Sequence, residues 1–136
     1  MLVETVTLQV PETLYQRLVN TARATKRSLE EVMLHALRVG SPPAWDDAPA
    51  EFQADLAMMD KLDDDALWKL ARGRKTSAEM ERYNALLERN KSGVLTGAER
   101  LELNALREEA DRFMLRKAHA AVLLRWRGHD VSAPRL

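Results

Sequence analysis

The chain contains no cysteine among its 136 residues. Without thiolates it forms neither disulfide bonds nor cysteine-ligated metal sites. Aromatic residues make up only 5% of the sequence, so we expect a core built of Leu, Ala and Met. No apolar run approaches the length of a membrane-spanning helix, and the first residues lack the features of a signal peptide. We therefore expect a cytoplasmic protein that does not contact a membrane.

Motifs of catalysis are also missing. The five glycines are scattered singly near predicted helix ends and form no phosphate-binding loop, and no serine lies in a G-x-S-x-G context. The three histidines are His35, His119 and His129, and the last two are too far apart to share one helical turn as metal ligands. We predict that the protein is not an enzyme and that it binds neither a metal nor a cofactor.

Near the N-terminus, residues 4–10 alternate between apolar and polar side chains. Val6, Leu8 and Val10 form the apolar face, and Thr5, Thr7 and Gln9 form the polar face. A period of two predicts a β-strand. An isolated strand leaves its backbone N–H and C=O groups unpaired, and no second strand of comparable quality follows in the sequence. We therefore predict a homodimer in which two copies pair through this strand and bury its apolar face.

Two amphipathic helices are predicted to follow the strand. The first runs from roughly residue 12 to residue 25, after Pro11 and with an apolar stripe at helical spacing. Ser28 and Glu31 have the spacing of a capping box, which predicts the start of the second helix. Gly40 and the two prolines after Ser41 end it.

The order strand, helix, helix over residues 3–40 resembles the ribbon-helix-helix family of repressors and antitoxins. Two stretches carry the resemblance, VTLQVPETLYQRL from residue 6 and RSLEEV from residue 27. In that family a two-stranded ribbon lies in the major groove of DNA, and the start of the second helix binds a phosphate. The resemblance implies that operator DNA is bound by Thr5, Thr7, Gln9, Lys26, Arg27 and Ser28.

Charge divides the chain into three segments. Residues 1–40 hold five basic and four acidic side chains, residues 41–71 hold two and eight, and residues 72–136 hold fourteen and nine. Three prolines within residues 41–49 predict a stiff, acidic linker. The predicted organisation is thus a dimerising, DNA-binding head (1–40), a linker (41–49) and a helical, partner-binding region (50–136).

The last region is predicted to be helical throughout. Three consecutive aspartates suggest a divalent-cation site: Asp63, Asp64 and Asp65. Their position favours the alternative, in which they cap and begin a helix. Thr76 and Thr96 begin two further capping boxes, and about thirty residues without proline or glycine follow the second. We expect this long final helix to pack against residues 77–91 or against its mate in a dimer. The predicted fold class is mostly α, with the single N-terminal strand.

Aromatic and arginine side chains are the types that anchor protein interfaces. Candidates for partner binding are Trp45, Phe52, Trp68, Arg116 and Trp126. The aromatic residues are equally suited to a hydrophobic core, and the arginine to a solvated helix face.

Two functions of different classes follow from the sequence. The favoured hypothesis, which the resemblance implies, is an antitoxin-like regulator that binds operator DNA with its head and neutralises a toxin protein, expected to be a nuclease, with its C-terminal helices. The alternative is a dimeric helical scaffold or adaptor that does not bind DNA, which the uncharged polar face of the strand supports.

Overall fold

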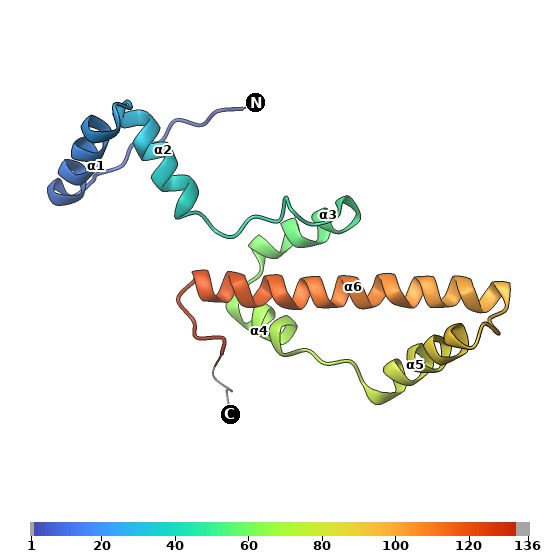
Figure 1. Ribbon diagram of the computed structural model, residues 1–136. Helices are drawn as coiled ribbons and strands as arrows, with labels where there is room; N and C mark the ends of the chain where they lie inside the picture. The colour runs from blue at the N-terminus through green and yellow to red at the C-terminus, as the bar shows by residue number, and fades with distance from the viewer. Residues whose placement is uncertain (1, 133–136) are drawn as a thin grey trace. The chain divides into compact units, whose positions relative to one another are not determined.

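The computed structural model describes residues 2–132 and is built from helices. They are α1 (Glu12–Thr25), α2 (Leu29–Val39), α3 (Ala50–Met58), α4 (Asp64–Arg72), α5 (Ser77–Lys91) and α6 (Gly97–Trp126), with the short 3-10 helix η1 (Met59–Lys61) between α3 and α4 (Figure 1). The chain divides into two compact units, which we call unit 1 (Met1–Ser41) and unit 2 (Pro42–Leu136).

Residues 2–132 contain no β-strand, so the predicted ribbon-helix-helix fold and the resemblance to that family are wrong. Residues 2–11 have no regular secondary structure, and the side chains from Leu2 to Gln9 are exposed. The alternation of side chains is suited to a strand, but a strand forms only when its backbone groups pair with a neighbour. The described part of the chain offers this segment no such neighbour. The predicted mostly helical character and the long final helix are confirmed.

Unit 1 is a pair of helices in contact with each other. Helix α1 is followed by its C-cap residue Lys26, which adopts a left-handed backbone conformation with φ of 55°. The backbone N–H of Arg27 then donates to the carbonyl oxygen of Ala22 at 3.0 Å, and the chain turns into α2. The Ser28 hydroxyl accepts a hydrogen bond from the Glu31 backbone N–H at 3.1 Å, which confirms the predicted cap.

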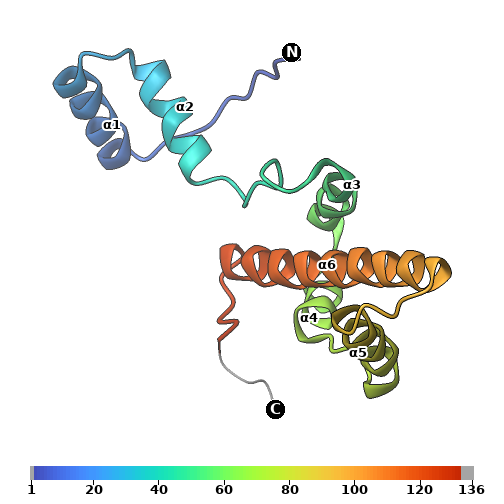
Figure 2. The same cartoon turned by 45° about the vertical axis from the view of Figure 1, so that its right-hand side comes forward.

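Unit 2 is organised around α6, a helix of 30 residues. It begins with a complete capping box between Thr96 and Glu99, as the sequence predicts. At a rise of about 1.5 Å per residue, α6 is roughly 45 Å long. Helices α3 and α4 lie on opposite sides of it (Figures 1 and 2), and α4 makes its most extensive helix contact.

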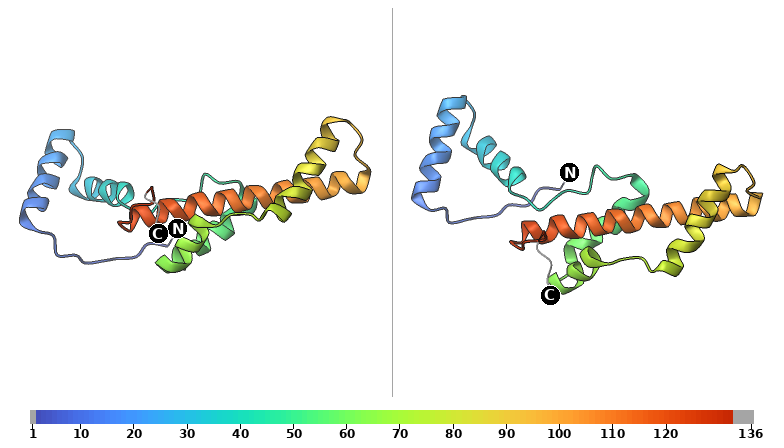
Figure 3. Two further views of the ribbon diagram at one scale, coloured as in Figure 1. Left: turned by 90° about the horizontal axis from the view of Figure 1, so that it is seen from below. Right: turned by 60° about the horizontal axis from the view of Figure 1, so that its bottom comes forward.

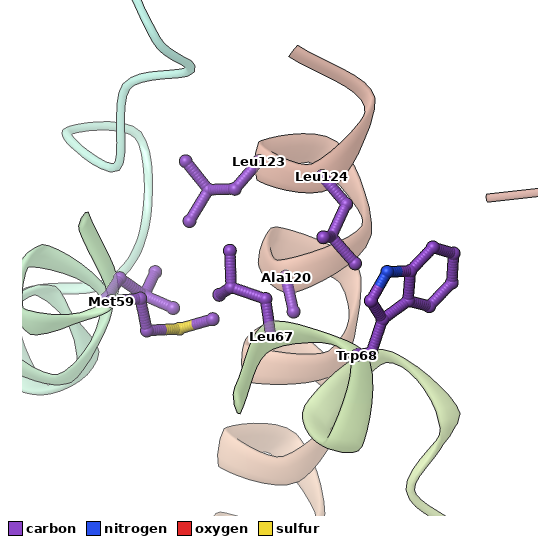
Figure 4. Packing of buried hydrophobic residues seen from close by; sticks show 7 residues of the cluster. Met59, Leu67, Trp68, Ala120, Leu123 and Leu124 are labelled. Atoms are coloured by element: carbon purple, nitrogen blue, oxygen red, sulfur yellow. The ribbon is translucent and has the colours of Figure 1, made fainter. Parts of the chain in front are cut away.

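The core of unit 2 lies where α3, η1 and α4 meet the last turns of α6. Its buried members are Leu56, Met59, Leu67, Trp68, Ala120, Leu123 and Leu124. Figure 4 shows Met59 and Leu67 directed toward α6, with Trp68 beside Leu124. Residues 120, 123 and 124 share one face of the helix because they are three and four positions apart. Removal of these apolar side chains from water is the main stabilising contribution to unit 2.

Helix α5 packs against the N-terminal part of α6. The guanidinium of Arg82 donates to both carboxylate oxygens of Glu102 at 2.8 Å, and Arg89 pairs with Glu99 at 3.0 Å. Leu86 on α5 and Leu103 on α6 are buried. The predicted packing of the long helix against residues 77–91 is therefore present, but α4 contributes more of its contacts.

None of the helices between residues 2 and 132 combines the length and apolar character that crossing a membrane requires.

Candidate partner-binding surfaces

Unit 1 exposes most of its large apolar side chains. They are Leu2, Val3, Val6, Leu8, Leu14, Tyr15, Leu34, Leu37 and Val39, and we call them the unit 1 apolar surface. Val6 is 81% exposed, Leu8 71% and Val39 73%, whereas the only buried hydrophobic residues of the described part of this unit are Ala22 and Val32. Val10, Leu18, Val19, Leu29 and Met33 are only partly buried, so the core is small for a unit of about forty residues. Additional apolar contacts would therefore stabilise unit 1.

Of the predicted DNA-binding residues, Lys26, Arg27 and Ser28 lie together and exposed in the turn before α2. Ser28 directs its hydroxyl to the helix backbone as a cap. The other three, Thr5, Thr7 and Gln9, are exposed in the irregular segment before α1. Without a strand these three side chains do not share a fixed face. The predicted dimerisation residues Val6 and Leu8 are also exposed there, and Val10 is half-buried.

In unit 2 a groove lies between α5 and α6, which we call the α5–α6 groove. It opens because α5 is inclined to α6 (Figures 1 and 3), so the two helices do not close along their whole length. Its volume is about 540 Å³. The apolar lining consists of Met80, Tyr83 and Leu87 from α5 and of Leu106, Ala110, Phe113 and Met114 from α6. Met80 and Met114 are 49% and 62% exposed, so the apolar wall of the groove is open to water.

One end of this groove is basic. Its charged lining consists of Arg74, Lys75, Lys117 and a single acidic residue, Glu79. The Lys117 ammonium donates to the carbonyl oxygen of Gly73 at 3.0 Å, and the Lys75 ammonium lies 5.6 Å from the centre of the Phe113 ring. A smaller adjoining depression shares Lys75, Glu79, Phe113 and Lys117, and its further charged lining consists of Lys69, Arg112, Arg116 and Glu109. The connection between α4 and α5 thus places excess positive charge beside an apolar surface.

The structure places the five predicted partner-binding residues in different surroundings. Phe52 and Trp68 are buried, and Trp45 packs against the core. Trp68 also carries the Arg72 guanidinium 4.3 Å above its ring. Arg116 is exposed beside the basic end of the groove, and Trp126 is 51% exposed at the end of α6. These last two are exposed, whereas Trp45 is partly buried.

The three consecutive aspartates act as a helix start. The Asp63 carboxylate accepts a hydrogen bond from the Ala66 backbone N–H at 2.8 Å, which confirms the predicted cap. Asp64 binds the Arg127 guanidinium at 3.0 Å and His129 Nε2 at 2.7 Å. The hydrogen bond from Arg127, and then that from His129, lower the pKa of the Asp64 carboxyl. These contacts join the start of α4 to the end of α6. Within residues 2–132 no three His, Asp or Glu side chains are grouped to hold a metal ion.

His119 faces the interior of unit 2 and is 9% exposed. Burial lowers its pKa, because the charged imidazolium loses hydration there. Among the described residues nothing hydrogen-bonds to its Nε2. Burial therefore favours the neutral ring, which does not line the α5–α6 groove.

No family model matches the sequence, and comparisons with curated proteins and with solved structures give no match either.

The α5–α6 groove is the feature that the sequence analysis missed. The apolar stripes on both helices are visible in the sequence, and they predict that the helices pack together. They do not predict the inclination that leaves Met80 and Met114 open. The available signal was the adjacent basic pair Arg74 and Lys75, which lies at one end of the groove.

Proposed function

We propose that the protein is a homodimeric adaptor, in which unit 1 joins two copies of the chain and unit 2 binds a protein partner. The unit 1 apolar surface is the observation that carries this proposal. With five basic and four acidic residues, unit 1 is nearly neutral up to residue 40, so two copies approach without strong repulsion. A large apolar side chain contributes about 1.5–3 kcal/mol when fully buried. Several from each copy together offset an association cost of roughly 4–15 kcal/mol.

Light scattering coupled to size-exclusion chromatography tests the first half of this function. We expect the full chain to elute with the mass of a dimer at micromolar concentration. The double variant Val6→Glu, Leu8→Glu should shift it to a monomer, because burying two carboxylates at an apolar interface is costly. Both residues are highly exposed in the single chain, so the substitutions do not disturb its own core.

The matched control is the double variant Thr5→Glu, Thr7→Glu, which adds the same charge to the neighbouring polar positions of the same segment. This control should remain a dimer. A monomeric mass for the unmodified chain would contradict the proposal. Equal dissociation by both double variants would show that charge alone, and not the apolar side chains, determines the association.

A second, more specific function is that of an antitoxin-like regulator, in which unit 1 binds operator DNA and unit 2 blocks a toxin. Lys26 and Arg27 support it, because they are exposed where the chain turns into the start of α2. Basic side chains and helix N-termini are the groups that contact DNA phosphates. The uncharged residues Thr5, Thr7 and Gln9 lie in an irregular segment. They would contact the DNA only if this segment became ordered on binding.

Fluorescence anisotropy with a labelled DNA duplex at low salt distinguishes the two functions. If DNA is bound, Arg27→Ala should weaken binding to all sequences and reduce its salt dependence. Arg17→Ala removes another exposed charge, from the middle of α1, and serves as the control. Absence of DNA binding by the unmodified chain at low salt would leave the adaptor as the function.

A further inference from the structure

We propose that the α5–α6 groove binds an amphipathic helix of a partner protein, and that this helix carries acidic residues beside its apolar stripe. The inference deepens the proposed function, because it assigns the site and the chemistry of the partner bound by unit 2. It rests on three observations: the helical spacing of the apolar lining, the excess positive charge at one end, and the exposure of two methionines.

The shape of the groove fits a helix. Its lining residues on α6 run from Leu106 to Lys117 at intervals of three and four positions, which is one continuous face. That face is roughly 16 Å long, about three turns of a docked helix. Helices of this kind bind in grooves through side chains that recur every three or four residues. The flexible side chains of Met80 and Met114 can adapt to such anchors.

The charge of the groove lining favours a partner helix that carries acidic residues. Arg74, Lys75 and Lys117 line one end of the groove, and the only acidic lining residue is Glu79. Arg116 adds a further exposed positive charge in the adjoining depression. Acidic residues flanking the apolar stripe of a partner would be attracted to this end, and basic residues would be repelled.

The acidic segment of the same chain does not satisfy this requirement. Most of its acidic residues lie on α3 and α4 or next to them, and these helices already pack against other parts of α6. Asp55 pairs with Arg112 at 2.9 Å, and Asp64 pairs with Arg127. Unit 1 of a second copy is nearly neutral and lacks the excess of acidic residues that the groove requires. The occupant is therefore a different protein.

Binding of a synthetic peptide to the full-length protein tests the inference. The probe is a fluorescein-labelled peptide of about eighteen residues, five helical turns, with Leu at intervals of three and four and Glu on both flanks. A second peptide has Lys in place of every Glu. We expect the acidic peptide to bind at least about tenfold more tightly than the basic one by fluorescence anisotropy.

Two pairs of variants locate the site. Met114→Glu should weaken binding of the acidic peptide by about tenfold or more, whereas Leu101→Glu should leave it unchanged. Leu101 is the matched control because it is 72% exposed on the same helix and lies outside the groove lining. Arg74→Glu should reduce the difference between the two peptides, and Arg100→Glu, an exposed residue near Leu101, should not.

The possible results distinguish peptide binding in the groove from dimerisation through unit 1. Binding of the acidic peptide to a chain that light scattering shows to be monomeric would support the groove and contradict only the role of unit 1. Failure of the acidic peptide to bind, equal affinity for both peptides, or equal effects of Met114→Glu and Leu101→Glu would overturn the inference. A change of oligomeric mass on Met114→Glu would also overturn it, because a second copy would then occupy the groove.

Discussion

At the scale of single residues, Asp64 differs from the two aspartates beside it. Asp63 caps a helix, and Asp65 is exposed in its first turn. Asp64 instead accepts from both Arg127 and His129, two residues that follow the long helix. The Asp64 carboxylate therefore links the start of α4 to the residues that follow α6. The Arg127 guanidinium strengthens this junction by also donating to the carbonyl oxygen of Leu62 at 2.8 Å.

The stabilisation from Asp64 should depend on pH. Its pKa is lowered in the folded state, so the carboxylate form is favoured by folding. The contribution is complete above the ordinary pKa of 3.8 and is lost as pH falls through the lower, folded-state pKa. We expect Asp64→Asn to lower the melting temperature near neutral pH, with a smaller effect in acid. Thermal melts followed by circular dichroism from about pH 7 to about pH 3 measure it.

Asp65→Asn is the control for this experiment, because it removes a neighbouring exposed carboxylate of the same helix turn. It should change the melting temperature only slightly at either pH. Equal destabilisation by both variants would mean that the helix dipole, and not the contacts with Arg127 and His129, accounts for the effect.

At the scale of elements, the contact between α4 and α6 determines the stability of unit 2. Leu124 is fully buried in it. We expect Leu124→Ala to reduce the free energy of unfolding by about 2–5 kcal/mol, the usual cost of a large-to-small core substitution. Val122→Ala changes a residue of the same turn that is 41% exposed, and it should cost much less. Urea unfolding monitored by tryptophan fluorescence measures both, and similar losses would contradict the described packing.

The elements also show what sequence patterns can predict. The starts of α2, α4, α5 and α6 were predictable because each cap is a short-range hydrogen bond between residues three positions apart. The strand over residues 4–10 was predicted wrongly, because an alternating pattern describes side chains and does not supply a partner for the backbone. Pairing of α4 with α6 was not predicted, since it depends on packing between helices that are distant in sequence.

Among the candidate site residues, too, local properties were predictable from the sequence and tertiary ones were not. The exposure of Lys26, Arg27 and Ser28 agrees with their place in a turn between two helices, which is a local property. The burial of Phe52 and Trp68 results from tertiary packing. In a sequence, an aromatic residue is equally consistent with a position in the core and with a position in an interface. The α5–α6 groove depends on the inclination of two helices, for which the sequence contains no local signal.

At the scale of the whole molecule, the two units differ in how they are stabilised. The core of unit 2 contains residues of that unit alone. We expect a fragment of residues 42–136 to retain its helix content and to melt cooperatively, as measured by circular dichroism. If unit 1 associates as proposed, the complementary fragment of residues 1–41 should be largely unfolded at low concentration and gain helix as its concentration rises. A fragment 42–136 without a cooperative transition would contradict this division.

The core of unit 2 also determines when the chain can fold during its synthesis. Leu56, Met59, Leu67 and Trp68 leave the ribosome long before Ala120, Leu123 and Leu124, the residues that cover them. Until the last turns of α6 have emerged, α3 and α4 present their apolar faces to the cytosol or to chaperones, and such faces promote aggregation. Unit 1 is synthesised before this core is complete. If it joins two copies as proposed, two nascent chains on one messenger would associate before either has completed its C-terminal core.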